Sequence, residues 1–130
     1  MPGPIQSLQL QSSTGPAGLA LQNGTPTLLT YTAPADGNLH VVEILSALVV
    51  TTLEVGGAIG ASVVGSAPFG NGGPNPIFAS AQAAGSYYGG VTGLMVPLRF
   101  VVGPGCTVNV AQTAALTGGA AAYYGEIWAS

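Results

Sequence analysis

Short hydrophobic runs alternate with turn-forming clusters along most of this chain. From Leu19 onward, runs rich in β-branched and aromatic residues recur at intervals of about ten residues, with glycine, proline and asparagine between them. Such spacing is typical of a sandwich or barrel of strands rather than of alternating strands and helices. The pattern predicts strands at 19–21, 25–32, 39–52, 58–64, 77–81, 92–102, 107–113 and 121–128.

The clusters between these runs contain the residues that tight turns require. Glycine and asparagine readily adopt a positive φ, and proline supplies a fixed φ. We therefore expect the chain to turn at each cluster: Asn23-Gly24, 34–38, Gly56-Gly57, 70–76, Gly85, Gly89-Gly90, 103–105 and Gly118-Gly119.

The run 39–52, LHVVEILSALVVTT, contains no glycine or proline and is the strongest competitor for a helix. Its seven β-branched residues favour a strand instead. In a strand, the odd-numbered side chains from Leu39 to Val49 face one way and the even-numbered ones from His40 to Val50 face the other. Both faces are largely apolar, which indicates that both are covered. In a chain of this length, a neighbouring subunit is the simplest cover.

The first 16 residues differ from the rest of the chain. They combine three prolines and two glycines with polar glutamine and serine, and their apolar residues are few. We expect residues 1–16 to form an extended arm, which either contacts a neighbouring chain or is a frayed terminus. A single domain follows at 17–130. No basic segment precedes an apolar one, so the sequence predicts no signal peptide.

Charged residues are very scarce. Arg99 is the only basic residue of the 130, and the acids are Asp36, Glu43, Glu54 and Glu126, which makes 4% charged residues, against about 25% in ordinary domains. A single arginine releases too few counterions for nucleic-acid binding and forms no basic cluster for an anionic membrane. We therefore expect neither partner, and attachment through apolar contacts and neutral hydrogen bonds that salt affects little.

The sequence holds few residues suited to catalysis or metal binding. His40 and Glu43 lie three residues apart and so face opposite sides of a strand, and His40 is expected to be partly exposed. Cys106 is expected to be a small buried hydrophobic residue in a strand. The 36–38 segment, Asp-Gly-Asn, predicts a tight turn rather than a calcium site, which needs six to eight oxygen ligands. We expect no catalytic residue, no cofactor and no metal.

Aromatic residues form two clusters, Tyr87-Tyr88 and Tyr123-Tyr124 with Trp128. In the last strand, Tyr124 and Trp128 share one face and Tyr123 lies on the other. Core packing, a subunit interface and a platform for stacking sugars all use such residues. In the sugar-binding alternative, Tyr87, Tyr88 and Trp128 would stack on the ligand.

Two segments carry a family resemblance. The segment LLTYTAPADGNLHVVEILSALVV, at 28–50, resembles the opening of phage-encoded jelly-roll proteins of the tumour-necrosis-factor-like shape, and Pro34, Asp36 and Gly37 match their first turn. VPLRFVVGPGCTVNVAQT followed by AAAYYGEIWAS resembles their ending, with the second turn at 103–105 and the penultimate strand at 107–110. The resemblance covers 25–130. It implies a homotrimer that serves as a capsid decoration (cement) protein, a head fibre or a receptor-binding knob.

We therefore predict an all-β fold, an antiparallel β-sandwich of jelly-roll type with an extended N-terminal arm. The predicted function is that of a trimeric capsid decoration protein, which binds the outer capsid surface of the virion and reinforces contacts between major capsid proteins. An alternative is a receptor- or carbohydrate-binding knob of a phage fibre. The predicted subunit interface is Val42, Ile44, Leu48, Tyr123, Tyr124 and Trp128, and the predicted capsid-binding residues of the arm are Ile5, Leu8 and Leu10.

Overall fold

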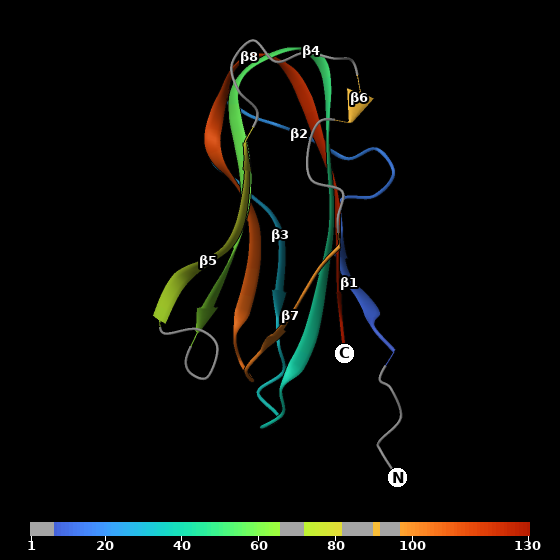
Figure 1. Cartoon of the computed structure of the whole chain (residues 1–130), viewed down its shortest axis with the longest axis vertical. Coiled ribbons are helices and arrows are strands. Elements are labelled where there is room, and N and C mark those ends of the chain that lie inside the picture. Colours follow the sequence, from blue (N-terminus) through green and yellow to red (C-terminus); the bar gives the residue numbers. More distant parts are fainter. Residues whose placement is uncertain (1–6, 66–71, 82–89, 92–96) are drawn as a thin grey trace.

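The computed structural model describes residues 7–65, 72–81, 90–91 and 97–130, and within these ranges every regular element is a strand (Figure 1). All the strand pairs are antiparallel. The predicted all-β antiparallel class is therefore confirmed. The strands are β1 (Gln9–Ser13), β2 (Leu19–Ala20), β3 (Thr27–Thr32), β4 (His40–Gly65), β5 (Gly72–Ala81), β6 (Gly90–Val91), β7 (Leu98–Val102) and β8 (Thr107–Ala129).

The two longest strands, β4 and β8, form a ribbon that builds both layers of the molecule. They pair from Val42 opposite Ala129 to Val64 opposite Thr107, and the ribbon bends over at the top of Figure 1. In one half, which we call the first sheet, the strand order is β1-β8-β4-β7, with β2 beside β8 and β6 beside β4. In the other half, the second sheet, the order is β3-β8-β4-β5.

Glycines lie where the ribbon bends. Gly57 has a φ of 81° and Gly119 a φ of 76°, and the pairing of β4 with β8 shifts register four times between Val50 and Ile59. The chain changes direction at Gly56-Gly57 and at Gly118-Gly119 with the positive φ that the sequence predicts, but it does so within one continuous strand in each case and not between two strands. A bulge admits an extra residue and bends the strand while the hydrogen-bonded ladder continues, and glycine adopts the positive φ that such a bulge needs.

Part of the predicted arm belongs to the first sheet. In β1, Gln9 lies opposite Ala129 and Ser13 opposite Glu126 on β8. Residues 9–13 of the predicted arm therefore form an edge strand of the first sheet. An edge strand joins a sheet through its main-chain groups, so it needs no apolar run that a sequence pattern would reveal.

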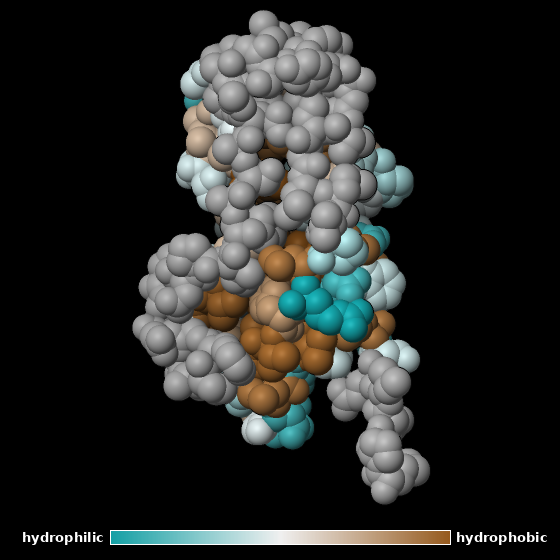
Figure 2. Space-filling view, in the orientation of Figure 1, coloured by the Kyte–Doolittle hydropathy of each residue, from teal (hydrophilic) through white to brown (hydrophobic). Residues whose placement is uncertain are grey.

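The hydrophobic core lies between the two sheets. Val42, Ile44 and Ile127 of the first sheet belong to the same buried cluster as Ile59 and Val108 of the second. Leu98 and Phe100 on β7 are partly buried against this cluster, and Figure 2 shows hydrophobic residues gathered at the surface around β7, beside a hydrophilic group. Cys106 is fully buried, as expected, although it lies directly before β8 rather than in the strand.

Candidate functional site

Four of the six predicted interface residues lie in the core of their own chain. Val42, Leu48 and Tyr123 are 0% exposed and Ile44 is 1% exposed. The prediction that they contact another subunit is wrong, because their side chains face the second sheet. Tyr124 is half-buried on the opposite face of β8. The sequence pattern indicated two apolar faces, and only the course of the ribbon decides which one is internal.

Tyr123 has a structural role in this core. Its hydroxyl lies 2.7 Å from Oγ of Ser46, and Ser46 pairs with Gly125 on the neighbouring strand. A Cβ on Gly125 would overlap the ring of Tyr123, so the glycine leaves the space that the ring occupies. Burial raises the pKa of the Tyr123 phenol, and the hydrogen bond with Ser46 partly opposes this. The phenol therefore stays neutral, and its hydroxyl has a hydrogen-bond partner between the sheets.

The outer face of the first sheet is mostly apolar. Residues opposite each other in an antiparallel pair share a face, and here Trp128 lies between Leu10 and Glu43, and Val41 lies opposite Val101. Leu10 is 47% exposed, and the other apolar members are half-buried. We call the following set the apolar face: Leu10, Val41, Leu45, Ala47, Val49, Val101, Ala122, Tyr124 and Trp128.

The charged groups on this face are bonded within it. Nη2 and Nε of Arg99 both donate to Oε2 of Glu43, at 2.6 and 2.9 Å. Nε1 of Trp128 donates to Oε1 of Glu126 at 3.1 Å. An exposed ion pair of this kind adds only about 0–1 kcal/mol to stability. The ion pair matters more for the charge of the surface than for stability, because it neutralises the charge of Arg99. The acid that then remains on the apolar face is Glu126.

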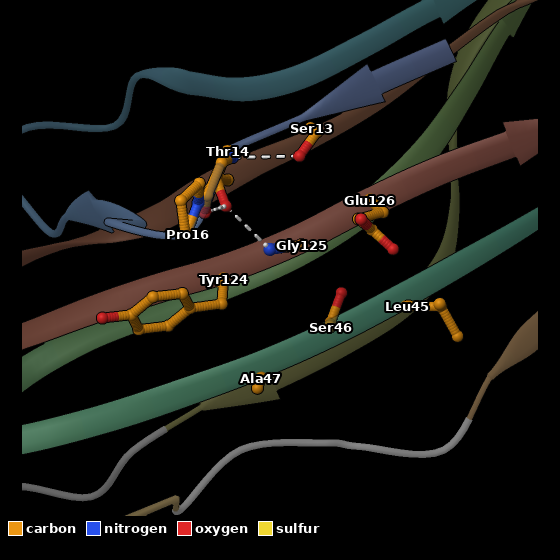
Figure 3. A pocket seen from close by; sticks show the side chains of 10 residues that line it. Ser13, Thr14, Pro16, Leu45, Ser46, Ala47, Tyr124, Gly125 and Glu126 are labelled. Atoms are coloured by element: carbon orange, nitrogen blue, oxygen red, sulfur yellow. Dashed lines mark hydrogen bonds between the residues drawn. The ribbon is translucent and has the colours of Figure 1, made fainter. Parts of the chain in front are cut away.

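A groove of about 520 Å³ lies on the apolar face (Figure 3). Leu45 and Ala47 of β4 and Tyr124 and Glu126 of β8 line it from the sheet, and the turn at 13–16 lines it from the side. The lining combines the apolar side chains of Pro16, Leu45, Ala47 and the Tyr124 ring with the hydroxyl-bearing residues Ser13, Thr14 and Ser46 and one carboxylate. Its chemistry suits an apolar side chain or a neutral segment better than an ion.

Hydrogen bonds hold the turn that bounds this groove. The main-chain N–H of Thr14 donates to the carbonyl of Gly125 at 3.0 Å, and the N–H of Gly125 donates to Oγ1 of Thr14 at 3.2 Å. Gly18 has a φ of 70°, and a Cβ there would come within 2.8 Å of Cε2 of Tyr124. The ring of Tyr124 therefore rests against the glycine, and the groove is formed before anything binds.

A second open groove, of about 870 Å³, contains the histidine. Nδ1 of His40 lies 2.9 Å from the main-chain oxygen of Ser130, and Nε2 lies 3.0 Å from Oδ1 of Asp36. Both partners only accept hydrogen bonds, so the two bonds form together only when the imidazole is doubly protonated. The bond to Ser130 is the main cause that raises the pKa of His40, burial opposes it, and Asp36 raises it further.

The expectation of a partly exposed His40 is wrong, because the turn and the end of β8 leave it 6% exposed. The turn predicted at 36–38 is present, since the N–H of Asn38 donates to Oδ1 of Asp36 at 3.0 Å. That bond and the one with His40 lower the pKa of Asp36. The cluster does not have the geometry of a catalytic triad: Oγ of Ser130 accepts the N–H of Val41 at 3.0 Å and does not pair with the imidazole.

The outer face of the second sheet carries hydroxyl and amide groups. Oγ1 of Thr30 donates to Oδ1 of Asn109 at 2.8 Å, and the hydroxyls of Thr32 and Thr107 lie 2.9 Å apart. Ser62 pairs with Asn109 on the same face. We call Thr30, Thr32, Ser62, Thr107 and Asn109 the hydroxyl face.

The structure describes only some of the remaining predicted site residues. Ile5, Tyr87 and Tyr88 lie outside the described residues, so a sugar platform that uses the two tyrosines stays a prediction. Leu8 is half-buried. Across the described ranges, no three histidine, cysteine, aspartate or glutamate side chains are grouped so that they could hold a metal. Among the same residues, no helix is long and apolar enough to span a membrane.

Comparisons with known proteins find similarity of structure alone. No family model and no curated protein sequence matches this chain. It is similar to chains in two solved structures of infectious bursal disease virus, one of the Gx strain and one of the Gt strain. Each has 17% sequence identity and a TM-score of 0.39, and each match covers 95% of this chain and 30% of that chain. The present chain thus spans less than a third of the length of the chains that it matches.

Proposed function

We propose that this chain is a structural protein of a virus particle, a homotrimeric capsid decoration protein that binds the outer capsid surface and reinforces contacts between major capsid proteins. The resemblance of 28–50 and 96–113 to phage jelly-roll proteins supports the particle and the trimer. The observation that carries the proposal is the apolar face, because contact with another protein would remove its apolar side chains from water.

The size of the apolar face supports this reading. Nine residues of β4, from Val41 to Val49, extend about 27 Å, and four strands span about 14 Å between the outer two, so the face measures roughly 400 Å² in projection. Apolar patches of a few hundred Å² on soluble proteins are often interaction sites. Burial of this patch would supply the main driving force for association.

The alternative of a receptor- or carbohydrate-binding knob has weaker support. Its stacking residues include Tyr87 and Tyr88, which the structure does not describe. Trp128 lies on the apolar face and its indole N–H donates to Glu126, and the described residues bring no second aromatic ring of the predicted platform beside it. Binding to a glycan array would favour the alternative over the decoration protein.

Three measurements test the proposed function. Light scattering at micromolar concentration should give about three times the 12.7 kDa mass of one chain. Quantitative mass spectrometry of purified particles should find the chain at a fixed ratio to the major capsid protein, and cryo-electron microscopy should place it on the outer surface. A monomer in solution would contradict the trimer. Absence of the chain from purified particles would contradict the decoration role.

A further inference from the structure

We propose that the apolar face is the contact between copies of this chain, and that the groove beside the 13–16 turn receives Leu10 of the neighbouring copy. This inference rests on the proposed function in one respect, that the chain forms a homo-oligomer. It adds which surface makes the contact and which two points on it meet.

The choice of surface follows from the three kinds of strand face in the molecule. The inner faces are occupied by the chain's own core. The hydroxyl face has its polar groups satisfied by neighbours on the same face, such as Thr30 with Asn109, and water can complete them. The apolar face leaves Leu10 exposed and the other apolar side chains partly in contact with water. Association gains most by covering this third kind of face.

The charges on the apolar face indicate an uncharged partner. Arg99 is 63% exposed, yet two of its nitrogens are bonded to Glu43, so the face presents no unpaired cation to an acidic partner. Glu126 is hydrogen-bonded by Trp128, and it alone would attract few basic groups. A second copy of a chain with 4% charged residues matches such a surface better than a charged partner does.

Leu10 and the groove are complementary and separate. Leu10 projects from β1 opposite Trp128, whereas the groove begins at Glu126, two residues away along β8, and reaches Tyr124, four residues or about 13 Å away. One copy therefore offers Leu10 at one place and accepts a neighbour's side chain at another. Contacts of this head-to-tail type close into rings when the rotation permits, and a trimer is one such ring.

The groove is also prepared for its occupant. Tyr124 rests on Gly18 and the turn is bonded to Gly125 through Thr14. Entry of an apolar side chain therefore requires little ordering of the receiving chain, and a preorganised site loses less entropy on binding.

Ala47→Glu tests the face by placing a carboxylate in the groove. We expect the mass in solution at 10 μM to drop from three chains to one. The matched control is Ser62→Glu, on the same strand but on the hydroxyl face, which should leave the trimer intact. Circular dichroism and thermal unfolding of both variants verify that they fold.

Disulfide trapping tests the pairing of Leu10 with the groove and does not require a disruptive charge. Within one chain, positions 10 and 47 lie on strands separated by β8 and are offset by four residues, beyond the roughly 7 Å over which a disulfide joins two Cα atoms. A Leu10→Cys, Ala47→Cys double variant should therefore form covalent dimers and trimers on oxidation. A Leu10→Cys, Ser62→Cys variant should not.

The outcomes separate this inference from the proposed function. A wild-type monomer at all concentrations overturns the inference together with the proposed trimer. A wild-type trimer that withstands Ala47→Glu and forms no 10–47 crosslink overturns the inference alone. An Ala47→Glu trimer that no longer binds particles also overturns it, since the face would then contact the capsid.

Discussion

The apolar face and the hydroxyl face are built on the same two strands and yet have opposite surface chemistry. In the first sheet, Leu45 and Tyr124 point outward from β4 and β8. In the second sheet, Ser62 and Asn109 occupy the corresponding outward positions of the same strands. The inner faces of both halves are apolar and buried. The difference therefore cannot come from the core, and it indicates that the two outer faces meet different surroundings.

This contrast shows that one long bent strand can contribute side chains to two different outer surfaces. β4 has 26 residues, and its outward residues change from Leu45 and Ala47 in the first sheet to Ser62 and Val64 in the second, where hydroxyl and amide groups of β3 and β8 surround them. Strands with one polar face normally meet water there, whereas strands apolar on both faces are covered on both. A single strand thus contributes to two sheets with two different external environments.

The largest expected effect separates the inner face from the outer ones. Ile44→Ala should lower the free energy of unfolding by about 2–5 kcal/mol, since the removed atoms leave a cavity in the core. Val64→Ala, at a side chain that is 36% exposed, should lower it by less than about 1 kcal/mol. Chemical denaturation at one fixed protein concentration measures both. Equal losses would show that the inner and outer faces are wrongly assigned.

The next effect comes from making the two outer faces alike. Leu45→Thr brings a hydroxyl onto the apolar face, and we expect at least a tenfold weaker association, or about 1.4 kcal/mol. Thr30→Val brings an apolar group onto the hydroxyl face and removes the hydrogen bond to Asn109. It should leave association unchanged and lower stability by about 0.5–1.5 kcal/mol. Dilution series followed by light scattering give both constants. If Thr30→Val weakened association as much as Leu45→Thr does, the two faces would not differ in function.

A smaller effect should follow from pH at the end of the first sheet. The pKa of His40 is raised above its ordinary value of 6.5, so the contribution of His40 to stability is fully present below pH 6.5 and is lost as pH rises through the folded-state pKa. The pKa of Asp36 is lowered from 3.8, so its contribution is present above pH 3.8 and is lost only as pH falls through the lower folded-state value. Tyr31 is also close, and its pKa is raised by burial and then by Asp36.

We therefore expect Tm to decline between pH 6 and 9 in the wild-type chain. His40→Asn removes the titrating imidazole, and its Tm should change less over the same range. Thermal unfolding in a pH series measures this. A wild-type profile as flat as that of His40→Asn would contradict the bonded, protonated imidazole.

The smallest effect should come from salt. Raising sodium chloride from 0.1 to 1 M shortens the Debye length from about 10 to about 3 Å. The one ion pair on the apolar face lies within its own chain, so association should change by less than about threefold. Analytical ultracentrifugation at both salt concentrations measures it. Dissociation in 1 M salt would require charged contacts between copies instead of apolar ones.

Local patterns in the sequence determined the strands and several turns. The alternation in 39–52 follows from the two-residue period of a strand, and the 36–38 turn follows from an aspartate that bonds the main chain two residues on. Both depend on neighbours in sequence. A pattern of a few residues therefore suffices to predict them, although the strand forms only with its partners in the sheet.

Only the tertiary structure decided which apolar face of β4 is internal, because that depends on where the distant half of the ribbon lies. It also decided that Gly57 and Gly119 form bends within strands, since the same positive φ serves a bulge and a turn. The pairing of β1 with β8 and the burial of His40 beside Ser130 join residues about 90 or more positions apart. Such contacts depend on long-range packing, so a sequence pattern that spans a few neighbouring residues does not predict them.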